Sequence, residues 1–158
     1  MPDFFNIGMK IDVVNLKISR DYQIEINGNS EYVYGIEQAG PVFINTIGAA
    51  NTEKVALMCL DSTFKIINYS IIAIGRVDSV RVPISQIFKT ALLSNATRII
   101  VGHNHPSGVL EITSIDKDMT QKIGGLAKWF DIELIDSIVV NDISAISIRK
   151  EIEDLANG

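Results

Sequence analysis

Apolar residues recur along the chain first with the spacing of strands and later with the spacing of helices, which predicts an α/β domain. Residues 53–60 and 64–74 are rich in Val, Ile, Leu and Tyr and flank Asp61-Ser62-Thr63, so they predict a hairpin of two strands. A short apolar run at 98–102 predicts a buried strand. Residues 132–140 and 145–148 predict two final strands, and the chain from Glu151 onward predicts a short helix or a tail.

Two segments carry apolar residues three and four positions apart, as one face of a helix does. The first helix is expected to begin with Pro83 in its first turn and to end near Asn95. The second is marked by a stripe of large apolar residues: Ile115, Met119, Ile123, Leu126 and Phe130. Gly124 and Gly125 would let this second helix approach the sheet closely.

The first third of the chain is less regular. Residues 11–26 alternate loosely and end at the turn signal Asn27-Gly28-Asn29, which predicts a strand or hairpin. A broken helix is expected from Ser30 to Ile47, interrupted by glycines and a proline. We therefore expect an extension at 1–35, one domain at 36–150 and a tail at 151–158.

Composition narrows the function classes. The chain has 158 residues, of which 47% are hydrophobic and 21% charged, as in one globular domain. A net charge of −5, with 14 scattered Lys and Arg, gives no strong nucleic-acid signature. Met1 to Lys10 resembles no signal peptide and no stretch reaches membrane-spanning length, so a cytoplasmic location is expected. A single cysteine, Cys59, excludes a disulfide and a Cys-type zinc site within one chain.

Both histidines of the chain lie in one tripeptide, His103-Asn104-His105, directly after the strand expected at 98–102. Residues two positions apart in an extended segment project to the same side, so the two imidazoles face one point. Strand ends present two nitrogen ligands to Zn²⁺ in this way, with an Asp, Glu or His as the third ligand and water at the fourth position. Such pairs also occur without a metal, so the spacing alone is a weak signal.

Asp116 is the best candidate for the third ligand. It lies in the first turn of the second helix, after a loop whose Pro106 and Gly108 can turn the chain back toward the strand end. The sequence from Thr113 to Asp116 has another interpretation, because it matches a helix capping box. The two roles are compatible, since one carboxylate oxygen can bind a metal while the helix start holds the side chain.

The string His103-Asn104-His105-Pro106-Ser107-Gly108, followed by Thr113-Ser114-Ile115-Asp116, resembles the H-x-H-P-(x)6-S-x-x-D signature of JAMM (MPN+) metallohydrolases in its RadC-like form. The resemblance implies that His103, His105 and Asp116 bind zinc and that an upstream Glu is the general base. Glu53 heads the segment Glu53 to Asp61, which has the RadC-like pattern E-x-x-x-x-x-x-L-D. The implied fold is a cytidine deaminase-like α/β domain with a mixed sheet flanked by helices.

The resemblance covers about Ile36 to Ile148, with three departures. Thr113 stands where the family has a serine that helps to stabilise the oxyanion, a role its hydroxyl could also serve. Pro83-Ile84-Ser85 replaces Pro-Arg-Glu, and Asp136-Ser137 replaces Asp-His. These changes leave the metal set intact but alter surfaces that a RadC-specific partner would use. Residues 11–30 do not resemble the helix-hairpin-helix region of longer RadC-like proteins, so a short form is expected.

The resemblance thus implies a zinc metallopeptidase or isopeptidase that acts on a peptide or protein conjugate, with Glu53 and Thr113 as catalytic residues. The alternatives are a non-catalytic interaction module of the same fold and an accessory role in DNA repair or mobile elements. A zinc deaminase is excluded, because it needs an H-x-E and a P-C-x-x-C that one cysteine cannot supply. The sequence leaves a homo-oligomer open.

Overall fold

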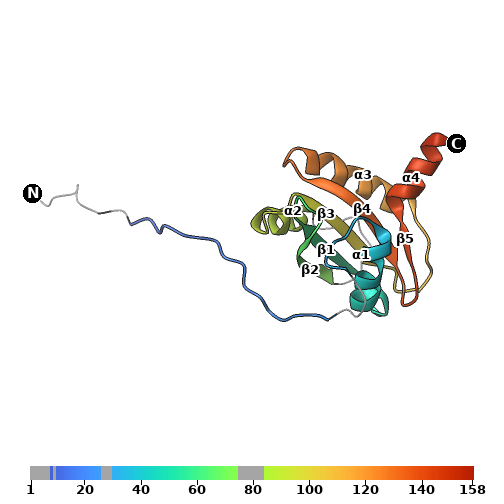
Figure 1. The fold of residues 1–158 in the computed structure, drawn as a ribbon, viewed down its shortest axis with the longest axis horizontal. Helices are drawn as coiled ribbons and strands as arrows, with labels where there is room; N and C mark the ends of the chain where they lie inside the picture. The colour runs from blue at the N-terminus through green and yellow to red at the C-terminus, as the bar shows by residue number, and fades with distance from the viewer. Residues whose placement is uncertain (1–7, 9, 26–29, 75–83) are drawn as a thin grey trace, which may run out of the picture.

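The computed structural model describes residues 8, 10–25, 30–74 and 84–158, and its centre is a mixed five-stranded sheet (Figure 1). Its strands are β1 (Lys54–Leu60), β2 (Ile66–Ile74), β3 (Arg98–Asn104), β4 (Glu133–Val140) and β5 (Ala145–Ser147), in the spatial order β2-β1-β3-β4-β5. β3 and β4 are parallel, whereas the other neighbours are antiparallel. Parallel neighbours need a crossover, and helix α3 (Ser114–Lys128) supplies it.

Helices cover both faces of the sheet and divide the core in two. Odd-numbered residues of β1 and β3 point to the core shared with α2 (Ile84–Leu93) and α3. Even-numbered residues of the same strands point to the core under α1 (Ile36–Phe43) and the π-helix η1 (Ile44–Gly48). Helix α4 (Ile148–Asn157) packs on α3 and β4. This alternation, a consequence of the two-residue period of a strand, decides which side chains share a face with the predicted histidine ligands.

Helix α1 comes very close to β3 at Gly102. A Cβ atom at Gly102 would overlap the ring of Phe43, which in turn packs edge-on against Tyr69 with ring centroids 5.2 Å apart. Because Gly102 directly precedes His103, this contact fixes the backbone at the point where β3 enters the candidate site.

The structure confirms the α/β class, the mixed sheet flanked by helices, the hairpin, the helix after the histidine loop and the two final strands. The strand expected at 98–102 runs on to Asn104, so His103 lies within it. The helix near residue 84 is also present, although Pro83 lies outside the described residues. No helix in the described part of the chain is long and apolar enough to cross a bilayer.

Three expectations are wrong. Residues 11–25 form no strand but extend away from the domain (Figure 1); Ile26 and the turn at 27–29 lie outside the described residues. The helix expected from Ser30 begins only at Ile36, because residues 31–33 are held by backbone hydrogen bonds beside the start of β2. Neither Gly124 nor Gly125 makes a close approach: a Cβ would meet Leu134 at an ordinary 3.6 Å from Gly124 and open space at Gly125. The domain limits at 36 and 150 stay predictions.

Candidate metal centre

The end of β3 delivers both histidines to one face of the sheet. Ile99 and Val101 point into the core under α2 and α3, so His103 and His105 follow on the same side. Their Nε2 atoms lie 3.2 Å apart, and the ring centroids lie 5.0 Å apart. The pairing inferred from the tripeptide is therefore present in the structure.

Asp116, in the first turn of α3, completes a cluster of three potential ligands. His103 Nε2 lies 3.0 Å from Asp116 Oδ1, and His105 Nε2 lies 3.7 Å from Asp116 Oδ2. The ligand atoms of the three residues all lie within 4.8 Å of one another. Tetrahedral zinc with bonds of about 2.0–2.1 Å separates its ligand atoms by roughly 3.3 Å, so the spacing fits such an ion. These three residues could therefore hold a metal ion.

The two carboxylate oxygens of Asp116 have different partners. Oδ2 accepts hydrogen bonds from the backbone N–H and the hydroxyl of Thr113, both at 2.8 Å, while the Asp116 N–H donates to Thr113 Oγ1. This is a complete capping box, so the alternative interpretation of the Thr113–Asp116 segment is correct. Oδ1 lies 3.0 Å from His103 Nε2, so the capping box leaves this oxygen available to a metal ion.

Burial alone would raise the pKa of Asp116, but the hydrogen bond and the charge of His103, together with the bonds from Thr113, hold the pKa well below its usual range. The side chain therefore stays anionic throughout the physiological range. A permanently charged oxygen beside two imidazoles is the donor set that a divalent cation needs.

Thr113 lies at the site through its contact with Asp116. Its hydroxyl hydrogen points to Asp116 Oδ2, and its oxygen accepts the Asp116 N–H at 3.2 Å. In this arrangement the single O–H donor of Thr113 is used by Asp116, so an oxyanion would receive it only if the side chain changed partner.

Glu53 lies directly before β1, at the end of that strand which pairs with the histidine end of β3. β1 pairs antiparallel with β3 so that Val55 lies opposite His103. Odd-numbered residues of β1 face the α2 and α3 side, as the two histidines do. The predicted base and the two predicted histidine ligands thus lie at the same end of the β1–β3 pair, and the role of Glu53 stays a prediction.

Asn104 is a functional candidate that the sequence analysis passed over. It lies between the histidines but points to the other face, where it is fully buried. Its Oδ1 accepts the N–H of Lys54 at 2.7 Å, and its Nδ2 donates to the carbonyls of Ala50 and Thr52 at 3.0 and 3.1 Å. These bonds bracket Glu53 and fasten its backbone to the strand that carries the histidines. The only sign in the sequence that Asn104 holds the chain around Glu53 was its position, because it is a polar residue on the side of the strand that faces the core.

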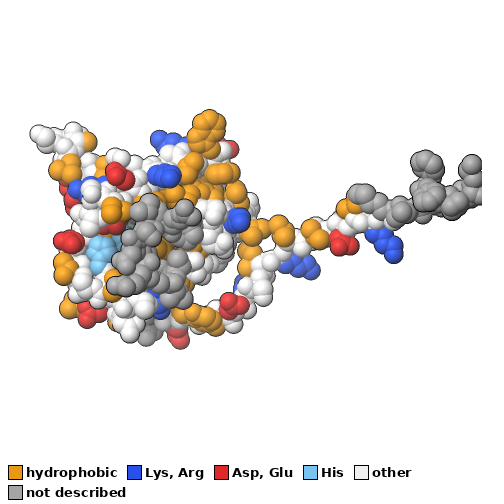
Figure 2. Space-filling view, turned by 180° about the vertical axis from the view of Figure 1, so that it is seen from behind, with side chains coloured by type: hydrophobic (Ala, Val, Ile, Leu, Met, Phe, Trp, Pro, Cys, Tyr) orange, Lys and Arg blue, Asp and Glu red, His pale blue; other side chains and the backbone are white. Residues whose placement is uncertain are grey.

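The site is open to solvent. The side chains of His103, His105 and Asp116 keep 13%, 17% and 12% of their surface exposed, and the imidazoles are visible on the face shown in Figure 2. Three ligands near the surface leave room for a fourth from water or a substrate, as in catalytic zinc sites.

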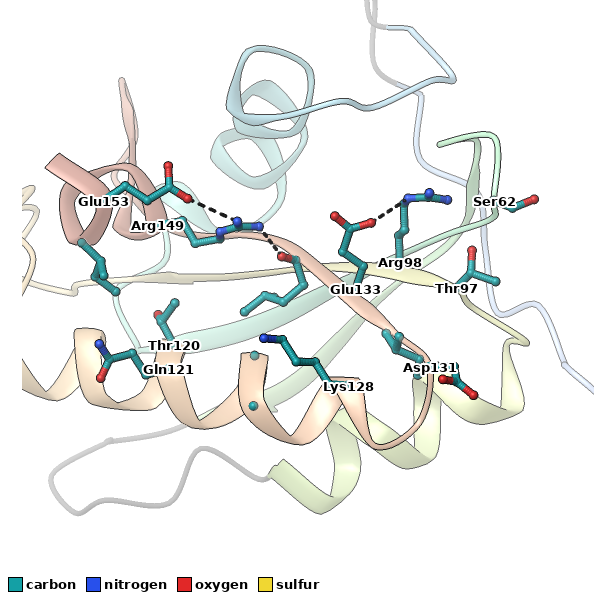
Figure 3. A pocket seen from close by; sticks show the side chains of 15 residues that line it. Ser62, Thr97, Arg98, Thr120, Gln121, Lys128, Asp131, Glu133, Arg149 and Glu153 are labelled. Carbon is teal, nitrogen blue, oxygen red and sulfur yellow. Dashed lines mark hydrogen bonds and ion pairs between the residues drawn. The ribbon is translucent and has the colours of Figure 1, made fainter. Parts of the chain in front are cut away.

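A groove of about 840 Å³ lies elsewhere, between α3, β4 and α4 (Figure 3). Its charged side chains are largely paired, with Arg98 on Glu133 and Arg149 on Glu153, each at 3.2 Å. One end of its lining is Arg98, the first residue of β3, roughly 16 Å along the strand from His103. The other end includes Thr120, one helical turn after Asp116. None of the five predicted site residues lines this groove, so it is a feature separate from the metal cluster.

A sequence model of a family described as the RadC-like JAB domain matches residues 33–153, a range that contains all five predicted site residues. A UPF0758 protein of Acidithiobacillus ferrooxidans is 32% identical over 99 residues, which is 63% of this chain and 44% of the relative. One from Xanthomonas campestris pv. campestris is 33% identical over 111 residues (70% and 49%), and one from Finegoldia magna is 30% identical over 114 residues (72% and 51%). The chain spans about half the length of these relatives.

Proposed function

The chain belongs to the RadC-like JAB domain family, and from that premise we propose that it is a zinc-dependent hydrolase of the JAMM type that cleaves amide or isopeptide bonds. The observation that carries the proposal is the convergence of His103, His105 and Asp116 at the spacing of a tetrahedral ion, close to the surface. The domain supplies the site, and a peptide or protein conjugate is the proposed substrate.

Zinc suits the donor set, because two neutral imidazoles and one carboxylate are ordinary ligands of catalytic zinc. When bound, zinc lowers the pKa of a coordinated water from about 15.7 to about 7 and polarises a carbonyl. Asp116 holds its charge at neutral pH, and Thr113 and the helix start keep its Oδ2 in place, so Oδ1 is presented in a fixed direction.

Glu53 is the proposed general base. Glu53 directly precedes β1, and Val55 of that strand is paired with His103, which supports a place for the carboxylate near the cluster. There it would take a proton from the attacking water and return it to the leaving amine. Thr113 is proposed to stabilise the oxyanion, which requires its hydroxyl to turn from Asp116 toward the substrate. A well-placed donor of this kind contributes on the order of 3 kcal/mol.

A scaffold function is the second candidate, and one observation favours it. The hydroxyl of Thr113, the residue expected to act on the substrate, is engaged in capping α3. A module that binds zinc without turning over a substrate would need only this structural role. The link to DNA repair or mobile elements and the cytoplasmic location both stay predictions from the sequence.

Metal content tests the site itself. We expect purified wild-type protein to bind about one zinc ion per chain and the variant with His103→Ala and His105→Ala to bind none. Zinc at about 100 times its Kd should also stabilise the wild type by about 2.7 kcal/mol, seen as a higher Tm that chelation reverses. An equal zinc content in both proteins would show that His103 and His105 do not bind the metal.

Turnover tests the chemistry. On a panel of peptides and isopeptide-linked conjugates, we expect the zinc-loaded wild type to cleave at least one substrate class and Glu53→Gln to lose most of that rate while keeping its zinc. Cleavage that persists in Glu53→Gln would exclude Glu53 as the base. Full zinc binding with no cleavage of any conjugate would favour the scaffold.

A further inference from the structure

The two edges of the sheet are built differently. β5 forms one edge of the sheet and has only three residues, so it can make few backbone hydrogen bonds to an added strand. β2 ends the other edge with nine residues, Ile-Ile-Asn-Tyr-Ser-Ile-Ile-Ala-Ile, which include no charged residue and no proline. Exposed edges of this length are normally blunted by charges, prolines or a cover, because they pair readily with other chains. Ile67 and Ile71 of β2 are in addition exposed.

The segment of residues 10–25, here called the arm, has the complementary character. It extends from the domain without secondary structure (Figure 1). Seven of its large apolar side chains are exposed: Ile11, Val13, Val14, Leu16, Ile18, Tyr22 and Ile24. Segments that remain disordered lack such residues, because disorder accompanies low hydrophobicity. The arm therefore has the composition of a segment that becomes covered.

The order of residues in the arm is that of a half-buried strand. Val14, Leu16 and Ile18 alternate with Asn15, Lys17 and Ser19, and Tyr22 and Ile24 alternate with Gln23 and Glu25. An extended chain with this alternation has one apolar and one polar face. Burying apolar side chains stabilises a folded protein, so an uncovered arm forgoes this stabilisation.

The chain just after the arm already lies at the β2 edge. Val33 N–H donates to the carbonyl of Phe64, and Ile66 N–H donates to the carbonyl of Glu31, both at 2.9 Å, in an antiparallel bridge between Tyr32 and Lys65. Residues 31–33, a few positions after the arm in the sequence, thus lie at the start of β2, whose outer edge lacks a neighbour among the described strands.

We propose that two copies of this chain form a symmetric dimer in which the arm of each copy lies as an added strand along β2 of the other copy. In the single chain the arm projects away from its own sheet, so the exchange covers both apolar arms and both uncharged edges at once. The sixteen residues of the arm reach roughly 50 Å when extended, and nine-residue β2 is roughly 30 Å long, so the arm can span its partner strand.

The mass of the 158-residue protein in solution, measured by light scattering, tests the exchange. We expect twice the 17.4 kDa of one chain for the wild type. A Val14→Asp, Leu16→Asp variant should show half that mass, because the apolar face of the arm is lost. Ile143→Asp is the matched control: Ile143 is 77% exposed, against 76% for Leu16, but lies in the turn between β4 and β5, so this variant should stay dimeric.

A second variant addresses the other side of the contact. Ile71→Lys places a charge on β2 and should also halve the mass, while its thermal unfolding stays cooperative. A wild type that is monomeric at all concentrations would overturn the proposal. If hydrogen exchange then showed the arm protected in that monomer, the arm would lie on its own sheet instead. A dimer that survives the double substitution in the arm would overturn it equally.

Discussion

Asn104 accepts a 2.7 Å hydrogen bond from the backbone N–H of Lys54, the residue next to Glu53. The strand that carries the metal ligands therefore also holds the chain that carries the proposed base. The amide of Asn104 is buried and has backbone partners on both sides of Glu53, so this side chain helps to hold the proposed base relative to the two histidines.

Replacing Asn104 should separate metal binding from catalysis. Asn104→Ala leaves the N–H of Lys54 and the carbonyls of Ala50 and Thr52, all in part-buried hydrogen bonds, without this partner. We therefore expect a loss of about 1–3 kcal/mol in unfolding free energy. Asn104→Asp keeps the acceptor for Lys54 but loses both donors, and it serves if the alanine variant does not fold. Both should lower kcat more than KM at unchanged zinc content, measured by metal analysis and steady-state kinetics. Unchanged kcat in a folded variant would show that Asn104 does not position the base.

Substitutions at Thr113 distinguish capping from catalysis. Thr113→Val keeps the shape but removes the hydroxyl that binds Asp116, so we expect about 1 kcal/mol less stability and weaker zinc binding. Thr113→Ser keeps the hydroxyl and should restore both properties. If Thr113 also acts on the oxyanion, the zinc-saturated Val variant should have a kcat reduced by about 100-fold or more. A kcat equal to that of the wild type at zinc saturation would restrict Thr113 to capping.

Two glycine-to-alanine substitutions should change stability in opposite directions. In Gly102→Ala the new methyl would overlap the Phe43 ring, so we expect a loss of about 1–3 kcal/mol. Gly125→Ala adds a methyl to open space on an exposed helical position and should stabilise by up to about 1 kcal/mol. Chemical denaturation of both variants measures the difference. A Gly102→Ala variant as stable as the wild type would mean that α1 can move away from β3 freely.

Asp136 should make stability depend on pH. Burial raises the pKa of Asp136, and hydrogen bonds from Ser147 and the Ser137 N–H offset this only in part. An acid whose folded pKa is raised destabilises the native state once it ionises, so its effect is absent below the unfolded pKa of about 3.9 and grows as pH rises above it. Asp136→Asn should therefore stabilise more at about pH 7 than at about pH 4.

Thermal unfolding across this pH range measures the effect, with exposed Asp118→Asn as the control. A stabilisation by Asp136→Asn that is the same at both pH values would contradict the role of the buried charge.

The sequence predicted the parts of the site that are local in the chain. The tripeptide His103-Asn104-His105 needed only the two-residue period of a strand, and the Thr113–Asp116 segment needed only the rules of a helix start. The bonds from Asn104 to the Glu53 loop join residues 50 to 54 positions apart, and no periodicity encodes such pairs.

The errors have the same origin. The alternation in residues 11–25 shows that the segment has an apolar face but not what covers it, and in the single chain nothing described does. The glycines that matter for close packing are likewise set by tertiary contacts: Gly102 meets Phe43, whereas Gly125 in the helix meets nothing.

The β3–α3 connection gives the two halves of the site different folding requirements. All three metal ligands lie in one stretch from the end of β3 to the first turn of α3, whereas Glu53 joins them only when β1 closes a long loop onto β3. Closing a longer loop loses more chain entropy, so we expect the ligand cluster to form ahead of the complete site during folding. The folding chain would thus be able to bind a metal before it could catalyse a reaction. The pairing of β1 with β3 would be the step that completes the catalytic site.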